Sequence, residues 1–382
     1  MKILFLDNLY LDVITRIGHL DEPLSGEKYS DLNENLNFQK FAAASMLSLE
    51  LGKIGHESSV IFSNSRKAQL AWILENEGKY QSFSRLAWKR WQLISRIPFF
   101  GTFIYNRTLP VRIFMKQIET QKPDYLYCVN INILNRRLIS KIQSLGIVVV
   151  GQIASPLPPR RFFMNYDHIF SAHPGMVATF QKLGVSSSWL ALAFDRSHFD
   201  KVSKSGWPER TRDVTFAGTF GRHQKTTGPL MKAIAKEVPG LEIYTFASPS
   251  RMRKMGLEKN YKGPAWGPEM HKIIAESKVV INRHGKVADG FAVNYRLFEG
   301  TGMGALVVTE EAKNMSDLFE AGKEIITYSN IEDAVKKVKR ALEETSTLAE
   351  IAKRGQAKTL NSHTFHNRAN QIAQTLIQMK TH

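Results

Sequence analysis

The chain has 382 residues, a formal net charge of +17 and a hydrophobic fraction of 43%. This length exceeds what one hydrophobic core usually supports, so we expect two α/β domains. The single cysteine, Cys128, excludes an intramolecular disulfide and any zinc site built from cysteines.

Charge and cysteine content indicate a compartment and a class of partner. One cysteine fits a reducing environment, and the N-terminus MKILFLDNLY lacks the long apolar stretch of a signal peptide, so we expect a cytoplasmic protein. The sequence contains no run of about 18 apolar residues, so we predict no transmembrane helix. The positive charge predicts an anionic partner. Because zinc-finger, RNP-type and basic-zipper patterns are missing, we expect no nucleic acid, and of the other anionic partners we favour a membrane surface over a phosphorylated substrate.

The chain opens with the pattern of a βαβ unit. Residues 2–6 are continuously apolar, as in a buried parallel strand, and Asp7 follows at its carboxyl end. A polar loop over 18–37, a helix within 38–57 and a strand over 59–62 complete the unit. Such units bind ligands beyond the carboxyl ends of their strands.

Residues 85–117 contain seven Arg and Lys side chains, no Asp or Glu, and several Trp, Phe and Tyr side chains. Pro98 predicts a break into two helical pieces. Cations mixed with aromatic rings suit the headgroup region of an anionic membrane. A core helix with a solvated basic face is the alternative interpretation.

Two further strands and a change of domain follow. Residues 123–130 and 147–154 predict buried strands, and residues 166–185 predict a short strand, a turn and a helix. The polar stretch 195–212 predicts a linker. We therefore place a first domain over residues 1–205 and a second over residues 206–365.

The second domain repeats the alternation of strands and helices, which predicts another parallel sheet. Strands are predicted over 213–221, 241–247, 278–285 and 305–309, and helices over 226–238, 294–304 and 331–344.

The turn after the first strand of this domain is a candidate phosphate site. Glycines let the backbone approach a diphosphate, helix N-terminal amides point at it, and cations neutralise it. A departing nucleoside diphosphate needs such charge, which the protein must supply where no metal does. A plain strand-to-helix turn is the alternative. The candidate residues are Gly218, Thr219, Gly221, Arg222, His223 and Lys225.

A second group of polar residues lies at the end of the strand predicted over 278–285 and shortly after it. It comprises Asn282, Arg283, His284, Asn294, Arg296 and Glu299. Arg296 and Glu299 are three residues apart and share one face of the predicted helix. A surface ion pair is the alternative interpretation of these two residues.

Several motifs here resemble the CgeB-like, group 1 family of glycosyltransferases. They are Arg296, Phe298-Glu299, Gly304, Thr309, the segment Leu318 to Ile325, HTFHNR at 363–368 and TFAGTFGRH at 215–223. The resemblance covers roughly residues 213–380. It implies an α/β GT-B fold, with two Rossmann-like parallel-sheet domains facing a cleft, and a final helix over 366–382 that packs back onto the first domain.

The resemblance also assigns roles to residues. It implies that Glu299 accepts hydrogen bonds from the ribose hydroxyls and that Arg296 and the loop with Arg222 contact the diphosphate. Phe298 joins the donor-binding set by the same match. Related retaining enzymes carry a second glutamate eight positions before the first; here Asp289 stands ten positions before Glu299, so retention or inversion stays open.

A general base for the acceptor is expected on the first domain. Asp7, His19 and Asp21 are the candidates, with Glu22 beside them and with His173 and His284 as further histidines. Each has an alternative role as a turn, cap or structural residue.

The sequence thus predicts a glycosyltransferase that moves a sugar from a nucleoside diphosphate, UDP first and then GDP or dTDP, to a cell-surface glycan or glycolipid-type acceptor. Cell-envelope polysaccharide synthesis at the inner face of the membrane would fit. We expect no cofactor and no metal, because no suitable pair of aspartates is present. A non-catalytic nucleotide-binding module, an epimerase and a phosphorylase are the alternatives.

Overall fold

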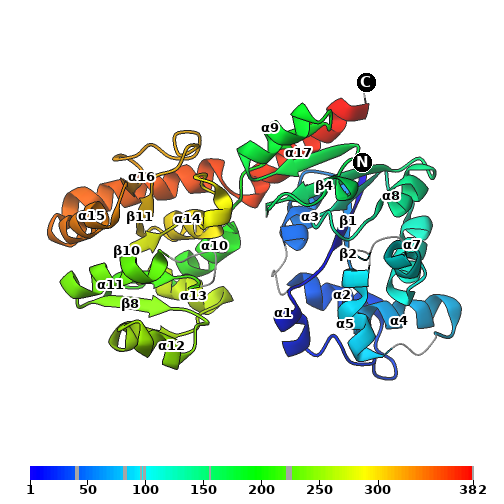
Figure 1. Cartoon of the computed structure of the whole chain (residues 1–382), viewed down its shortest axis with the longest axis horizontal. Coiled ribbons are helices and arrows are strands. Elements are labelled where there is room, and N and C mark those ends of the chain that lie inside the picture. The colour runs from blue at the N-terminus through cyan, green and yellow to red at the C-terminus, as the bar shows by residue number, and fades with distance from the viewer. Residues whose placement is uncertain are drawn as a thin grey trace. The chain divides into compact units, whose positions relative to one another are not determined.

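The structure is a computed structural model that describes residues 1–38, 43–80, 84–94, 97, 100–154, 156–220 and 226–380. The chain divides into two compact units (Figure 1). The first comprises Met1–Ser171, Gly175–Leu190 and Ala369–His382, and the second comprises Ala172–Pro174 and Ala191–Arg368. The division near residue 190 precedes the 205/206 boundary placed from the sequence, because helix α10 (Arg196–Ser205) packs against the second unit.

The first unit is built on a six-stranded parallel sheet with the order β2-β1-β3-β4-β5-β6. Because β1 lies between β2 and β3, the strand order reverses at β1, and Asp7 is its last residue. At the sheet centre the Tyr127 ring stacks on Phe170 and packs at a tilt against Phe5. The strands are β1 (Lys2–Asp7), β2 (Glu57–Phe62), β3 (Tyr125–Cys128), β4 (Val148–Ile153), β5 (His168–Ser171) and β6 (Ser187–Trp189).

The helices of this unit include one that the sequence did not predict. The expected polar loop over 18–37 contains α2, because Leu32 and Leu36 are buried and the helix packs against α4. The helices are α1 (Leu11–Arg16), α2 (Tyr29–Phe38), α3 (Ala43–Lys53), α4 (Arg66–Glu77), α5 (Arg85–Ile94), α6 (Phe100–Asn106), α7 (Leu109–Gln121), α8 (Arg136–Gln143) and α9 (Pro174–Lys182). No helix in the described parts of the chain is long and apolar enough to cross a membrane.

The basic and aromatic segment forms α5, α6 and most of α7. Pro98, where a helix break was predicted, lies outside the described residues. Trp88, Trp91 and Tyr105 are at most 1% exposed, so these three rings belong to the core and not to an outer surface. Trp91 stacks on Tyr105 at 5.5 Å between ring centroids. For these aromatic side chains the core interpretation is therefore correct.

The second unit is also built on a six-stranded parallel sheet, with the order β12-β11-β10-β7-β8-β9. Here the strand order reverses between β7 and β10. The strands are β7 (Arg212–Ala217), β8 (Leu241–Tyr244), β9 (Tyr261–Gly263), β10 (Ser277–Asn282), β11 (Leu306–Glu310) and β12 (Ile326–Tyr328). Their helices are α10, α11 (Thr227–Glu237), α12 (Pro249–Lys254), α13 (Gly267–Ala275), α14 (Tyr295–Gly302), α15 (Ile331–Glu343) and α16 (Thr345–Ser362).

Helices cover both faces of this sheet, as parallel strands require. Val279 and Ile281 belong to one apolar cluster with residues of α11 and α15. On the opposite face, α14 packs closely through its glycines, as predicted. A Cβ atom on Gly300 would lie 2.7 Å from Val307, and one on Gly302 would lie 2.6 Å from the Phe194 ring. Because these two glycines have no side chains, α14, which carries Arg296 and Glu299, can pack close to the sheet.

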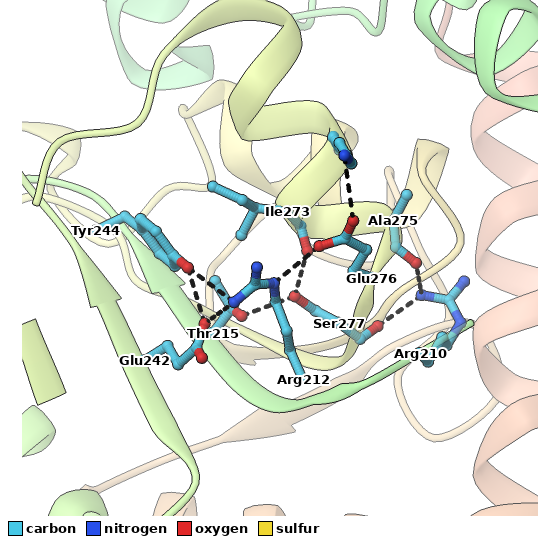
Figure 2. Close-up of polar contacts among 10 residues, drawn as sticks. Arg210, Arg212, Thr215, Glu242, Tyr244, Ile273, Ala275, Glu276 and Ser277 are labelled. Atoms are coloured by element: carbon cyan, nitrogen blue, oxygen red, sulfur yellow. Dashed lines mark hydrogen bonds and ion pairs between the residues drawn. The ribbon is translucent and has the colours of Figure 1, made fainter. Parts of the chain in front are cut away.

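Two arginines join the strands at the amino edge of this sheet (Figure 2). Arg212 forms ion pairs with Glu276 at 3.0 Å and with Glu242. Arg210 donates hydrogen bonds to the carbonyls of Ala275 at 3.1 Å and Ser277 at 2.6 Å. These contacts link the starts of β7 and β10 at the edge opposite the carboxyl ends of the strands.

The segment HTFHNR ends α16 and begins α17 (Phe365–Lys380). Arg368 donates to the carbonyls of Ala191 at 2.6 Å and Leu192 at 3.1 Å, which satisfies backbone groups that are otherwise buried. From Ala369 onwards α17 belongs to the first unit, where Tyr125 donates to the Leu376 carbonyl at 2.6 Å. The final helix is drawn in red in Figure 1.

Candidate donor site in the second unit

The turn after β7 is held at the carboxyl edge of the sheet. The Gly218 amide donates to the Tyr244 carbonyl at the end of β8, at 3.0 Å. Thr219 is exposed, and α11 begins shortly afterwards at Thr227. Gly221, Arg222, His223 and Lys225 lie outside the described residues. The described residues on the two sides of the turn are therefore a strand end and a helix N-terminus, where backbone amides favour an anion.

Arg283 brings a cation from β10 to the start of this helix. Its Nη1 atom donates to the hydroxyl of Thr227 at 3.1 Å, and its Nη2 atom lies 3.8 Å from Glu310. The side chain is 11% exposed. Because β10 lies beside β7, the reversal of strand order places this guanidinium next to the turn after β7.

Asn282, His284 and Asn294 hold the end of β10 in place. Asn282 donates to the Thr309 hydroxyl at 2.9 Å, and Asn294 donates to the Arg283 carbonyl at 2.8 Å. Asn294 also caps α14, since its side-chain oxygen accepts from the Leu297 amide at 3.3 Å. Burial lowers the pKa of His284 to about 4, so its imidazole is neutral at pH 7. These three side chains shape the backbone around Arg283.

Arg296 connects the end of β7 with Glu299. Its Nε atom donates to the Ala217 carbonyl at 2.9 Å, and its Nη1 atom lies 2.8 Å from Glu299 Oε2. The two side chains are 17% and 18% exposed. The ion pair of Arg296 and Glu299, one of the two interpretations of these residues, thus exists. It is partly buried, and Arg296 connects it to β7, the strand before the candidate phosphate turn.

A histidine that the sequence did not single out reaches the same carboxylate. His271 of α13 lies with Nε2 3.8 Å from Glu299 Oε1, and its Nδ1 contacts the Gly267 carbonyl at 2.8 Å. Its ring stacks on His198 of α10, with centroids 3.7 Å apart. Burial is the largest effect on His271 and lowers its pKa. Glu299 is therefore held by its ion pair with Arg296, and His271 lies beside it.

Phe298 does not face this site. It is 1% exposed and lies in the core, with its ring centroid 5.9 Å from that of Phe319 and 5.3 Å from that of His363. Neighbouring residues of a helix point in different directions, so Glu299 can face the carboxyl edge while Phe298 packs inside. These contacts give Phe298 a packing role.

A separate hollow of about 650 Å³ lies beside β11 and β12. Its lining includes Glu311, Met315, Phe319 and Thr327, and none of the predicted donor residues is among the lining residues. Across the parts of the chain that the structure describes, no group of three or more His, Cys, Asp or Glu side chains is arranged to hold a metal ion.

The three base candidates of the first unit have different surroundings. Asp7 is buried at the end of β1, accepts from the Asn8 amide at 2.7 Å, and has its pKa raised by burial to about 7. His19 is buried, contacts the Ser65 hydroxyl at 2.9 Å, and has its pKa lowered by burial to about 4. Asp21 forms an exposed ion pair with Arg85. These contacts favour structural roles for His19 and Asp21.

Two further candidates for the base, His173 and Glu22, also contact defined neighbours. His173 packs against Phe291, with ring centroids 4.7 Å apart, and burial lowers its pKa. Glu22 forms an ion pair with Arg66 on α4. Asp7 is thus the candidate that lies at the reversal of strand order in its sheet.

The sequence analysis did not single out Thr227 or His271. It named Arg283 in the second polar group but gave it no role in donor binding. Arg283 directly follows the apolar strand that had been recognised, so its position was a usable signal. His271 lies within a helix, and nothing in the spacing relates it to Glu299, 28 positions later. Only the packing of α13 against α14 brings the two together.

Comparison with known proteins shows that part of the chain is similar to a protein family. Residues 222–374, most of the second unit, match the profile of the family described as glycosyl transferase-like. Comparison by sequence with curated proteins yields no match. The narrower CgeB-like resemblance stays a prediction.

Solved structures share the architecture of the whole chain. Sucrose-phosphate synthase from Thermosynechococcus elongatus aligns with a TM-score of 0.61 and 9% identity, over 100% of both chains. HepE from Anabaena in complex with UDP aligns with a TM-score of 0.61 and 14% identity, over 99% of this chain and 100% of HepE. A glycosyltransferase from Rickettsia africae aligns with a TM-score of 0.61 and 10% identity, over 99% and 98%.

At these identities the structural similarity establishes the fold, which is GT-B. The profile match shows that most of the second unit is similar to a glycosyl transferase-like domain. Residues 222–374 are thus similar to the glycosyl transferase-like family, and the whole chain has the GT-B fold.

Proposed function

We propose that this glycosyltransferase takes its sugar from a nucleoside diphosphate, with UDP as the first choice, and binds that donor at the carboxyl edge of the second sheet. The observation that carries the proposal is the convergence of the α11 N-terminus, Arg283 and the pair of Arg296 and Glu299 around the reversal of strand order. The amides and guanidinium groups suit a diphosphate, and a carboxylate suits two hydroxyl donors.

UDP is favoured by one further finding. HepE, which shares the fold, has been crystallised with UDP and with UDP-glucose. In the proposed arrangement Glu299 accepts hydrogen bonds from the ribose hydroxyls, while Arg296 holds its carboxylate in place. Arg222 and Lys225 would add positive charge near the diphosphate.

Asp7 is the proposed general base for the acceptor. A base works best when its pKa lies near the operating pH, and burial raises the pKa of Asp7 to about 7. The backbone amides of Asn8 and Ala44 donate to its carboxylate and limit that rise. Asp7 ends β1, where the strand order reverses and α/β proteins commonly bind ligands.

The acceptor is proposed to be a cell-surface glycan or a glycolipid-type molecule at an anionic membrane surface. An exposed set of side chains on α5, on α6 and between them supports this: Leu86, Ile97, Phe103 and Ile104 are 45–56% exposed. Exposed cations lie on the same helices. The Arg107 guanidinium lies 3.7 Å from the centroid of the Phe103 ring. We call Leu86, Lys89, Arg90, Ile97, Phe103, Ile104 and Arg107 the basic-apolar surface.

Transfer is proposed to be independent of metal. The positive charge that stabilises the departing diphosphate would come from the α11 N-terminus and from Arg283, Arg296, Arg222 and Lys225.

Glu299→Ala should abolish nucleotide recognition. We expect UDP at 100 times its Kd to stabilise the wild type by about 2.7 kcal/mol in a thermal-shift titration, with GDP, dTDP and CMP as comparisons. Glu299→Ala should lose this stabilisation, because the ribose hydroxyls lose their acceptor. Glu343→Gln, an exposed glutamate of α15, is the matched control and should respond like the wild type. If no nucleotide stabilises the wild type, a non-catalytic interaction module becomes the better interpretation.

Chelation should leave transfer intact. Sugar transfer from UDP-glucose to a membrane-lipid extract is measured with and without EDTA, and we expect equal rates because protein cations stabilise the leaving diphosphate. Loss of transfer on chelation with recovery on adding a divalent ion would contradict metal independence. Product formed without any acceptor would instead indicate an epimerase.

Asp7→Asn should separate catalysis from stability. The native carboxyl, with a pKa of about 7, binds a proton more tightly than the unfolded one, with a pKa near 3.8. The stability it contributes is therefore full below about pH 3.8 and is lost as the pH rises to about 7. We expect Asp7→Asn to be more stable than the wild type at pH 8.5, on the order of 2 kcal/mol. The variant should bind UDP normally but lose transfer.

Asp124→Asn is the matched control for this experiment. Hydrogen bonds from the Lys2 amide and from Lys380 lower the pKa of Asp124, so its contribution to stability is lost as the pH falls. This variant should be less stable than the wild type at pH 8.5 and should retain transfer. Full transfer by Asp7→Asn would rule out Asp7 as the base.

Charge reversal on α5 should weaken membrane binding. The wild type should sediment with vesicles that contain anionic lipid at low salt, and Lys89→Glu with Arg90→Glu should weaken this binding about 10-fold or more, since each basic residue near such a surface contributes about 1 kcal/mol. Arg136→Glu with Arg137→Glu, an exposed basic pair on α8, is the control. Equal losses in both variants would show that only net charge matters.

A further inference from the structure

Two stacked histidines lie beside Glu299, the residue proposed to bind the ribose. His198 of α10 and His271 of α13 have ring centroids 3.7 Å apart and ring planes 14° from parallel. A carboxylate lies near each ring: His198 Nε2 is 3.7 Å from Asp195 Oδ2, and His271 Nε2 is 3.8 Å from Glu299 Oε1. All four side chains belong to the second unit and are 9–18% exposed. Two imidazoles thus lie between two carboxylates, partly shielded from solvent.

The hydrogen bond at Nδ1 of His271 decides what its Nε2 atom presents to Glu299. The Gly267 carbonyl accepts from Nδ1 at 2.8 Å, so Nδ1 carries the proton of the neutral ring. A neutral His271 therefore turns the lone pair of Nε2 toward Glu299 Oε1, and two acceptors form no hydrogen bond. A protonated His271 presents an N–H group there and attracts the carboxylate. The effect of His271 on Glu299 thus depends on one proton.

Charged groups from two other helices act on His271. Burial is the largest effect and lowers the pKa of His271; Glu299 of α14 and Asp195 of α10 oppose it, and Arg296 of α14 adds to it. Added negative charge near Glu299 therefore favours the proton on His271. The charged residues of the strands that α13 packs against, and of the end of α13, form ion pairs: Arg212 with Glu276, Lys272 with Glu276 and Lys278 with Asp213.

The stacked arrangement limits the two rings to one proton at a time. Like charges this close repel each other, so the pair takes up a first proton more readily than a second. That proton can lie on His198 beside Asp195 or on His271 beside Glu299. A diphosphate bound near Arg296 adds negative charge on the Glu299 side, so it draws the proton to His271.

Glu299 has enough acceptor sites for both His271 and the ribose. A carboxylate offers about four lone-pair sites on its two oxygens. Arg296 Nη1 lies 2.8 Å from Oε2, and a protonated His271 uses one site on Oε1. One site on each oxygen is then left for the two ribose hydroxyls. Protonation of His271 therefore fixes the carboxylate without blocking the proposed ligand.

We propose that His271 is a positioning residue for Glu299 and acts in its protonated form, so that the sugar donor binds more tightly as the pH falls. The inference rests on the proposed donor site, because His271 acts on the ribose only through Glu299. His198 is the alternative place for the proton. Since coupling between two ligands is reciprocal, binding of the donor also raises the affinity of the histidine pair for a proton by the same factor.

The test measures UDP-glucose binding by calorimetry between about pH 5.5 and pH 8.5, the range in which histidines change charge. UDP-glucose has two esterified phosphates and a constant charge, whereas a terminal phosphate titrates with a pKa of about 6. Titrations in two buffers with different enthalpies of ionisation give the number of protons taken up. The proteins are the wild type, His271→Gln, His198→Phe and His366→Gln. His366, an exposed histidine of α17 in the same unit, is the matched control.

We expect the wild type to bind UDP-glucose about 5-fold more tightly at the low end of this range than at the high end, and to take up protons on binding. His271→Gln should keep the weaker affinity at every pH and take up fewer protons, because its side chain cannot become charged. His198→Phe retains a stacked ring and should retain the pH dependence. His366→Gln should behave like the wild type.

Two results would overturn the role of His271 and leave the donor site standing. One is a wild type that binds UDP-glucose without proton uptake, a measurement that depends on no variant. The other is a folded His271→Gln, by its melting temperature, with the pH dependence of the wild type. A wild type that binds no UDP-glucose at any pH, or a Glu299→Ala that binds it normally, would overturn the donor site itself.

Discussion

The reversal of strand order near the middle of each sheet is the constraint on which the rest of this structure depends. In a parallel sheet the connections after two neighbouring strands leave in opposite directions where the order reverses, so their first residues remain uncovered at the carboxyl edge. In the second unit this happens between β7 and β10, and in the first it happens at β1. The glycine turn and Arg283 lie at one of these points, and Asp7 lies at the other.

Arg296 shows how tertiary contacts turn that opening into a specific site. Its guanidinium contacts the last carbonyl of β7 and the carboxylate of Glu299, so one side chain relates the proposed diphosphate region to the proposed ribose region. Small residues on α14 make this geometry attainable, because Gly300 and Gly302 allow the helix backbone to approach Val307 and Phe194. His271 of α13 lies beside this carboxylate, with its Nε2 atom 3.8 Å from Glu299 Oε1.

The two arginines at the opposite edge serve stability and not binding. Arg212 and Arg210 use their guanidinium groups on glutamates and on backbone carbonyls at the starts of β7 and β10. Buried polar groups need such partners, and an arginine can satisfy several carbonyls at once. A positively charged side chain in this protein therefore indicates a phosphate site only where the fold leaves it at the carboxyl edge.

The sequence by itself determined the α/β class, the two parallel sheets and the close packing of α14, since continuous apolar runs and glycine spacing are local properties of the chain. It also placed Arg296 and Glu299 three residues apart on one helix face, whereas their role in donor binding came from the family resemblance and stays a prediction. It could not distinguish a basic-aromatic surface from a core: Trp88 and Trp91 are buried because of what packs against them, which no local pattern records. The position of His271 beside Glu299 and the raised pKa of Asp7 were decided by the tertiary structure alone, because each depends on contact or burial between segments far apart in the chain.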